Sequence, residues 1–229
     1  MSKIPVIAIF DIGKTNKKLL LFDEHYKVVH EESRQLDEAK DEDGFACEDV
    51  ELLTQWVTDS FETLLKDDRF QIKAVNFSAY GASFVYLDKD LKVIPPLYNY
   101  LKPFAPALQK KFYNDYGGES RVSKETASPV LGNLNSGMQL YRLKHEKPEI
   151  FAEIKYALHL PQYLSLLVTG RPCADITSIG CHTQLWDFTA NRYHAWVKAE
   201  GLLEKLPEIL PADDVLHASF DGKHLLAGI

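Results

Sequence analysis

The sequence predicts an α/β fold in which a helix packs against a sheet. Short apolar runs that are typical of buried strands begin at residues 5–10 and recur at 19–23. Apolar residues at helical spacing follow over 50–65, and a strand-like segment returns at 72–78. This change from strand-like runs to helical spacing and back is the basis of the prediction.

The first two strands are predicted to form a hairpin. The apolar run Pro5–Phe10 stops at the polar turn Asp11–Asn16, and the chain resumes as a strand at Leu19–Asp23. A third strand is expected over Tyr26–Glu32. Three short strands with tight connections predict an antiparallel start to the sheet.

The turn of this hairpin has two interpretations. A carboxylate at the end of a strand, followed by a turn of backbone amides, suits a phosphate group and a metal ion together, with Asp11 facing the cation. Asp and Gly are also common in ordinary hairpin turns, so this stretch alone leaves both interpretations open. A P-loop is excluded, because Ala8 occupies the place of its first glycine and a strand follows Thr15.

The composition excludes several classes of partner. The chain has 229 residues, 45% of them hydrophobic, which is enough for one substantial core or two modest ones. The net charge is −7 and no basic cluster is present, so neither a nucleic acid nor a membrane is an expected partner. Cys47, Cys173 and Cys181 are an odd number without C-x-x-C spacing, which predicts a reduced, cytoplasmic protein rather than a disulfide framework or a zinc site.

A charged run precedes the most regular helical pattern in the chain. We expect Asp37–Asp43 to be a solvated loop without a function. The following helix presents an apolar face, and Glu48 and Asp49 are expected in its first turn, where acidic side chains are favourable. The apolar face consists of Val50, Leu53, Trp56, Val57, Phe61, Leu64 and Leu65.

A second polar corner is expected where the strand Ile72–Ser78 ends. It runs into Ala79–Ser83, and Phe84–Asp88 then resumes as a strand. Small residues on both sides of Tyr80 allow a ligand to approach the backbone closely. A β-bulge or a tight sheet corner accounts for the same residues, and the sequence leaves the choice open.

The rest of the chain is predicted to be largely helical. A helix beginning near Asn135 or Ser136 and another ended by Thr169-Gly170 have recognisable caps. The expected helices are 108–113, 135–144, 148–154, 161–168 and one around 196–197, with strands at 156–160 and 225–229, a loop at 97–103, and a loop or helical turn at 175–185.

In this order the pieces resemble the N-terminal domain of the FGGY family of carbohydrate kinases, across essentially the whole chain. The hairpin Phe10–Asn16 is similar to the first phosphate motif of that family, and Asn76–Asp88 is similar to its sugar-binding segment. The later matching segments are Lys144–Phe151, Leu158–Leu164, Leu167–Gly170, Asp175–Ser178 and Thr183–Asp187.

The resemblance implies a ribonuclease H-like, actin-like ATPase fold, with a mixed sheet flanked by helices. Residues 1–229 would be the sugar-binding first lobe of a two-lobe kinase. In that family a sugar binds between the lobes, the second lobe holds most of MgATP, and an aspartate base activates the sugar hydroxyl that attacks the γ-phosphoryl group. The implied function is ATP-dependent phosphorylation of a ketose or polyol, with ATP and Mg²⁺ as cofactors.

The resemblance also implies roles for individual residues. Asp11 would face Mg²⁺, and either Lys14 or Lys18 would add positive charge near the transferred group, a choice that the geometry must decide. The backbone amides expected at the terminal phosphates are those of Gly13, Lys14, Thr15 and Asn16. The residues expected at the sugar are Tyr80, Gly81, Ala82, Asn99 and Tyr100.

The chain departs from the family pattern at several positions. Lys14 replaces a small residue, Leu101-Lys102 stands where relatives often carry an arginine and an acid, and Gln162 replaces an aspartate. No carboxylate matches the catalytic base, which we expect beyond Ile229 together with the ATP-binding lobe. This chain alone is therefore expected to phosphorylate little or no sugar.

These departures support an alternative, a non-catalytic sugar-binding or regulatory module with the same fold. A third possibility is another actin-like ATPase, or a sugar kinase of a separate family that shares the first hairpin. The Thr169-Gly170 and Asp175 region argues against it. The residues around Tyr80 resemble deoxyhexulose kinases more than glycerol kinases. A lone lobe would expose its apolar cleft face, so a homodimer is a further expectation.

Overall fold

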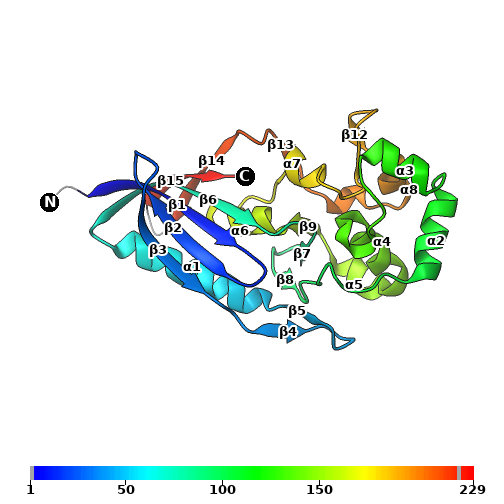
Figure 1. The fold of residues 1–229 in the computed structure, drawn as a ribbon, viewed down its shortest axis with the longest axis horizontal. Coiled ribbons are helices and arrows are strands. Elements are labelled where there is room, and N and C mark those ends of the chain that lie inside the picture. The colour runs from blue at the N-terminus through cyan, green and yellow to red at the C-terminus, as the bar shows by residue number, and fades with distance from the viewer. Residues whose placement is uncertain (1–2, 221–222) are drawn as a thin grey trace.

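The computed structural model describes residues 3–220 and 223–229 of the chain. The molecule is elongated, with a large sheet at one end and most of the helices at the other (Figure 1). Within the described residues, no helix is long and apolar enough to cross a lipid bilayer. A small sheet lies between the two ends and connects them.

The large sheet is mixed and contains the predicted opening strands. In the described part of the chain its strand order is β14-β15-β6-β1-β2-β3. The first three strands are antiparallel, as predicted, whereas β6 is parallel to β1 and β15 is parallel to β6. The strands are β1 (Ile4–Ile12), β2 (Lys17–Phe22), β3 (Val28–Arg34), β6 (Phe70–Ala79), β14 (Val215–Phe220) and β15 (Lys223–Gly228).

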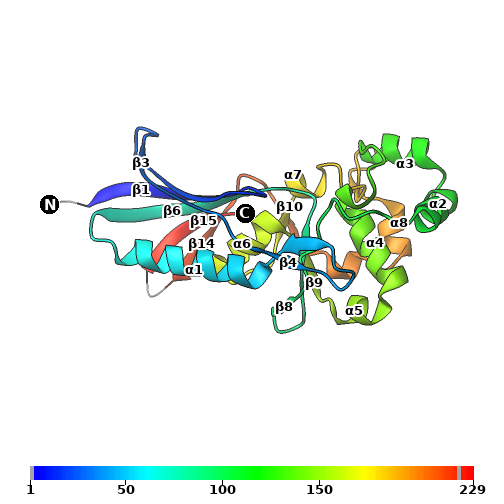
Figure 2. The same cartoon turned by 60° about the horizontal axis from the view of Figure 1, so that its bottom comes forward.

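Two helices, α1 (Val50–Lys66) and α6 (Leu160–Thr169), cover one face of this sheet (Figure 2). The alternating residues of β1 that face them are buried, and the Phe10 ring lies 5.8 Å from Trp56 and 5.6 Å from Phe77. The opposite face is less covered, since Ile7 remains 41% exposed and Ile9, on the same face, is only partly buried.

The small antiparallel sheet contains β7 (Phe84–Leu87), β8 (Val93–Ile94) and β9 (Tyr156–His159). All four residues of β7 are buried. Val85 and Leu87 pack into the core beneath the large sheet, whereas Phe84 and Tyr86 pack into a second core in the helical half. Because side chains alternate along a strand, β7 is shared by both cores.

Aromatic rings dominate the second core. The Phe112 ring lies 5.0 Å from both Tyr141 and Trp196. The helices of this half are α2 (Pro106–Asp115), α3 (Glu119–Thr126), α4 (Ser136–Glu146), α5 (Pro148–Glu153), α7 (Ile176–Ile179) and α8 (Ala195–Ala199). Two short strand pairs accompany them, β10 (Ala174–Asp175) with β13 (Ile209–Leu210) and β11 (Trp186–Asp187) with β12 (Arg192–Tyr193). Short 3-10 helices lie at Gly132–Leu134 and Leu203–Lys205.

Elements with a regular spacing of apolar residues were predicted well, whereas the structure of the charged run Asp37–Asp43 was not. Helix α1 matches the predicted apolar face, and Gly170 ends α6 in the left-handed conformation, with φ of 67°. The prediction of a solvated loop over Asp37–Asp43 is wrong in part, because five of these seven residues are exposed but the run is not simply a loop. Those residues contain β4 (Glu38–Lys40), and the carboxylate of Asp41 is buried against Lys102 at 2.5 Å.

Burial of His159 predicts a pH-dependent stability. Its ring lies 4.3 Å from that of Phe84, its Nε2 lies 2.8 Å from the Ser136 hydroxyl, and burial lowers its pKa from an ordinary 6.5 to about 4. As the pH falls below 6.5, the unfolded chain binds a proton at this residue and the folded chain does not until about pH 4. The free energy of unfolding should therefore fall over this range, by up to about 3 kcal/mol from His159.

Urea unfolding of the chain between pH 7 and pH 4.5 measures this effect. The variant His159→Gln keeps a polar partner for Ser136 but does not titrate there. Its free energy of unfolding should decrease less with falling pH than that of the wild type. Parallel pH profiles for the two proteins would contradict the assignment.

Candidate functional site

The two polar corners predicted from the sequence meet at one edge of the large sheet. Strands β1 and β6 are parallel, and their register places Asp11 beside Ser78 and Ile12 beside Ala79. Beyond the end of β6, the Tyr80 N–H donates to the Ile12 carbonyl at 3.0 Å. The carboxylate of the first hairpin and the Tyr80 corner are therefore held at neighbouring strand ends.

The hairpin turn leaves polar groups available. The Gly13 N–H donates to the Asn16 carbonyl at 2.9 Å, and a Cβ on Gly13 would lie 2.9 Å from that oxygen, so glycine closes the turn. The N–H groups of Lys14, Thr15 and Asn16 have no acceptor within the part of the chain that the structure describes. Asp11 is exposed, and its carboxylate likewise has no partner among the described residues. Free amides next to a free carboxylate can serve an anion and a hard cation together.

Three lysines near this turn have different surroundings. Lys14 pairs with Glu38 at 2.7 Å and Lys18 pairs with Glu31 at 3.0 Å, both at the surface. Lys18 is the cross-strand partner of Asp11 and so lies on the same face of the sheet. Lys17 points to the opposite, buried face. The geometry therefore favours Lys18 over Lys14 as the cation nearest to Asp11.

The Tyr80 corner combines an aromatic pair with open backbone. The Tyr80 hydroxyl donates to Glu48 Oε2 at 3.1 Å, and burial together with the Glu48 charge raises the pKa of Tyr80. Its ring lies 6.1 Å from that of Tyr100. Gly81 is exposed with free space where a Cβ would stand. Ala82 adopts a left-handed conformation with φ of 63°, and its carbonyl accepts from Gln139 at 2.5 Å, so the corner is tight and fixed.

The loop carrying Asn99 is anchored rather than free. The Asn99 side chain donates to the Ala46 carbonyl at 3.0 Å and accepts from the Leu101 N–H at 3.0 Å, which leaves one amide hydrogen for a ligand. Lys102 lies between Asp41 and Asp43, at 2.5 and 2.6 Å, and so holds the loop to the chain ahead of β5 (Ala46–Glu48).

The residues that hold these segments in place were not identified as such from the sequence. Only the position of Lys17 gave a signal that could have been used. Glu48 was expected in the first turn of α1, but it lies in β5, and Asp49 caps the helix instead. The side chain of Glu48 forms an ion pair with Lys17. Lys17 lies on the buried face of β2, together with Leu19 and Leu21. A lysine at such a position requires a buried carboxylate, and this requirement could have been recognised from the spacing.

A cluster of possible metal ligands in the helical half does not fit a metal ion. The cluster contains Glu125, Asp187 and His194, whose ligand atoms lie within 4.8 Å of one another. Nδ1 of His194 accepts from the Trp196 N–H at 3.3 Å, which assigns the ring proton to Nε2, where it is donated to Glu125 at 2.8 Å. The other oxygen of Glu125 accepts from Arg121. Oδ1 of Asp187 accepts from the N–H groups of Thr189 and Ala190. Each of the three residues thus already uses ligand atoms in hydrogen bonds within the protein.

Two curated relatives of this chain are rhamnulokinases. It is 24% identical to a rhamnulokinase of Halalkalibacterium halodurans, over 77% of this chain and 37% of that protein, and 23% identical to a rhamnulokinase of Mannheimia succiniciproducens, over 72% of this chain and 34% of that protein. The chain thus spans well under half the length of these curated relatives.

The fold is also shared with solved structures. A carbohydrate kinase from Novosphingobium aromaticivorans superposes with a TM-score of 0.83 at 21% identity, covering 96% of this chain and 48% of that one. A glycerol kinase of Plasmodium falciparum with ADP gives a TM-score of 0.81 at 17% identity, covering all of this chain and 48% of that one. These similarities confirm the predicted actin-like fold.

A family model for the FGGY family of carbohydrate kinases, N-terminal domain, matches residues 6–229. This match covers nearly the whole chain and agrees with the shared fold. The chain therefore belongs to the FGGY family of carbohydrate kinases.

Proposed function

We propose that the protein carrying this chain transfers the γ-phosphoryl group of ATP to a hydroxyl of a ketose or polyol. This chain supplies the sugar-binding lobe and the first phosphate motif. The observation that carries the proposal is the meeting of Asp11 and the Tyr80 corner at one sheet edge, in a domain of a carbohydrate kinase family.

The phosphate side of the site consists of the hairpin turn. Asp11 fits a Mg²⁺ ligand, because it is an exposed carboxylate without a protein partner among the described residues. The unpaired N–H groups of Lys14, Thr15 and Asn16 suit phosphate oxygens, while Gly13 shapes the turn. Bound Mg²⁺ would offset the charge of the phosphates, and Lys18 would add positive charge on the same face.

The sugar side of the site combines rings with bare backbone. The rings of Tyr80 and Tyr100 offer apolar surface to the C–H groups of a sugar, and the free space at Gly81 lets hydroxyls approach the main chain. Ala82 fixes this corner, and Asn99 retains one amide hydrogen for a sugar oxygen.

No residue of this chain is assigned as the catalytic base. In the family pattern an aspartate following the present chain removes the proton of the sugar hydroxyl, and a second lobe holds most of ATP. The contribution of this lobe is positioning and charge, which dominate catalysis of phosphoryl transfer. Because two relatives are named rhamnulokinases, rhamnulose is the first sugar to test.

The proposal includes a reducing, cytoplasmic setting without nucleic-acid or membrane partners. The free thiols of Cys47, Cys173 and Cys181 and the net charge of −7 support it. A homodimer formed through the apolar cleft face that a lone lobe would expose is the corresponding proposal for its oligomeric state.

Replacing Asp11 tests the metal role. In the full-length protein, Asp11→Asn should lower turnover at least about 100-fold, because a neutral amide binds Mg²⁺ poorly next to phosphates. Sugar affinity measured by calorimetry should change little. The control is Asp23→Asn, since Asp23 lies at the other end of the same hairpin and accepts two backbone N–H groups that an asparagine oxygen can also accept. Unchanged turnover in Asp11→Asn would show that Asp11 does not hold the metal.

Adding a side chain at Gly81 tests the sugar pocket. A Cβ there meets no protein atom within 4 Å, so Gly81→Val should fold normally but fill space proposed for the sugar. The KM for the sugar should rise about tenfold or more, while the KM for ATP and the melting temperature stay near wild type. Ala107→Val, on the exposed side of α2, is the control. A sugar KM equal to that of the wild type would remove Gly81 from the site.

A further inference from the structure

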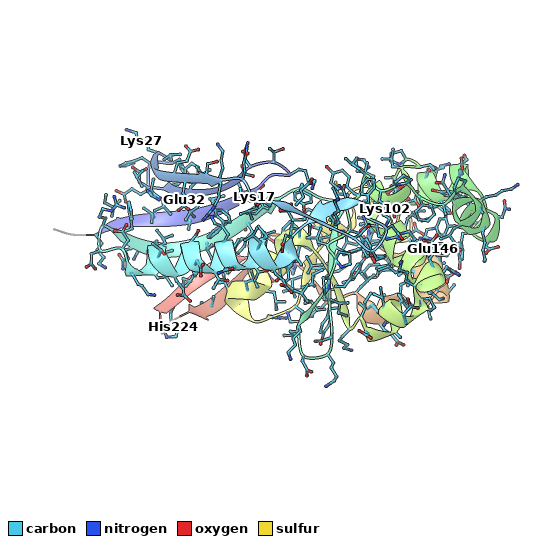
Figure 3. All side chains as sticks on the ribbon, turned by 90° about the horizontal axis from the view of Figure 1, so that it is seen from below. Lys17, Lys27, Glu32, Lys102, Glu146 and His224 are labelled. Carbon is cyan, nitrogen blue, oxygen red and sulfur yellow. The ribbon has the colours of Figure 1, made fainter. Side chains whose placement is uncertain are left out.

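A buried lysine lies beneath the hairpin turn. The Lys17 side chain is 2% exposed, on the face of β2 that packs toward α1. In Figure 3 it is labelled at the end of the sheet nearer the helical half. Its ammonium group donates to the Lys14 carbonyl at 3.0 Å and lies 2.8 Å from Glu48 Oε1. A charge removed from water in this way needs such partners, because burying it unpaired costs several kcal/mol.

Glu48 contacts three separate segments of the candidate site. Through Lys17 its carboxylate is linked to the hairpin turn, and it also accepts from the Tyr80 hydroxyl at 3.1 Å. Its backbone forms an isolated β-bridge with Leu97, which begins the loop that carries Tyr100. One residue of β5 thus connects the phosphate side of the site with its sugar side.

Such an arrangement specifies geometry more than it adds stability. Replacing a buried ion pair by apolar residues is often neutral for folding, but removing one partner leaves an uncompensated charge. The hydrogen bonds of Lys17 and Glu48 have fixed directions, so they define where the Lys14 carbonyl and the Tyr80 hydroxyl lie.

We propose that Lys17 and Glu48 are positioning residues that couple the hairpin turn to the Tyr80 corner. This inference rests on the proposed function for its meaning in catalysis. Neither residue touches a substrate. Glu48 holds the Tyr80 ring in place for the sugar, and Lys17 transmits the same constraint to the turn that receives the phosphates. Glu48 therefore acts on both sides of the site, and the Tyr80 hydroxyl acts on one.

The helical half offers a matched control. Glu200 is 9% exposed, pairs with Lys144 at 2.6 Å and accepts from the Tyr116 hydroxyl at 2.5 Å. It is a second Lys–Glu–Tyr arrangement, with a buried carboxylate and a partly buried lysine and tyrosine, among α2, α4 and α8 and away from the sheet edge. Its carboxylate also lies 3.3 Å from His145. A purely structural role would make Glu48→Gln and Glu200→Gln behave alike.

Amide hydrogen exchange of the 229-residue chain tests the coupling without relying on activity. Glu48→Gln should speed exchange at least about fivefold both in residues 13–17 and in 79–83, because two charge-assisted hydrogen bonds are weakened. The reporting amides are those of Gly13 and Tyr80, which donate to the Asn16 and Ile12 carbonyls in the folded chain. Tyr80→Phe should speed exchange only in 79–83, and Glu200→Gln in neither segment. Release confined to the surroundings of β5, or the same pattern for the two glutamate variants, would overturn the proposal.

A second variant keeps the test decisive if Glu48→Gln does not fold. Lys17→Met/Glu48→Leu replaces the buried charges by apolar side chains of similar size, which such sites often tolerate. The double variant should fold and still release both segments. Protection of either segment at the wild-type level would count against coupling through this pair.

Kinetics of the full-length protein separate the inference from the proposed function. Glu48→Gln should raise the KM values for both sugar and ATP, Tyr80→Phe should raise that for the sugar alone, and Glu200→Gln should change neither. If the wild type phosphorylates no sugar while the exchange pattern holds, the proposed function fails and the coupling stands. If the wild type is active and Glu48→Gln matches Glu200→Gln, the coupling fails.

Discussion

The parallel pairing of β1 with β6 is the constraint on which the candidate site depends. A register shift between Val6 and Ile7 inserts one extra residue of β6, so Asp11 lies opposite Ser78. Without this shift Asp11 would lie opposite Phe77, and every later residue of β6 would be displaced by one position. The irregularity at the far end of the strands thus determines which residues meet at the edge where Tyr80 follows.

The site lies where two cores share one strand. Tyr80 precedes β7, whose residues alternate between the core beneath the large sheet and the aromatic core of the helical half. Movement of β7 would disturb both cores, and protein interiors tolerate little such change. The Tyr80 corner is therefore attached to a rigid element, while its own backbone at Gly81 stays exposed. This combination provides a fixed and accessible surface for a ligand.

Local patterns could be predicted from the sequence, and partners distant along the chain could not. Helix α1 and strands β1 and β2 follow from the spacing of apolar residues. The burial of Asp41 against Lys102 depends on residues 61 positions apart, so a charged run looks solvated until its partner is known. Lys17 lies between these cases, because its place in β2 predicts burial but does not identify Glu48.

Hydrogen bonds and ion pairs can fix the segments around the candidate site in a way that apolar contacts cannot. In the proposed function the hairpin turn, the Tyr80 corner and the loop carrying Tyr100 expose their tips to a ligand, so the tips themselves cannot be fixed by burying a large apolar side chain. A buried ion pair fixes them from beneath through hydrogen bonds of defined geometry. Its desolvation cost is offset only where each donor and acceptor is satisfied. Lys17, with its contacts to Glu48 and the Lys14 carbonyl, comes close to meeting that condition.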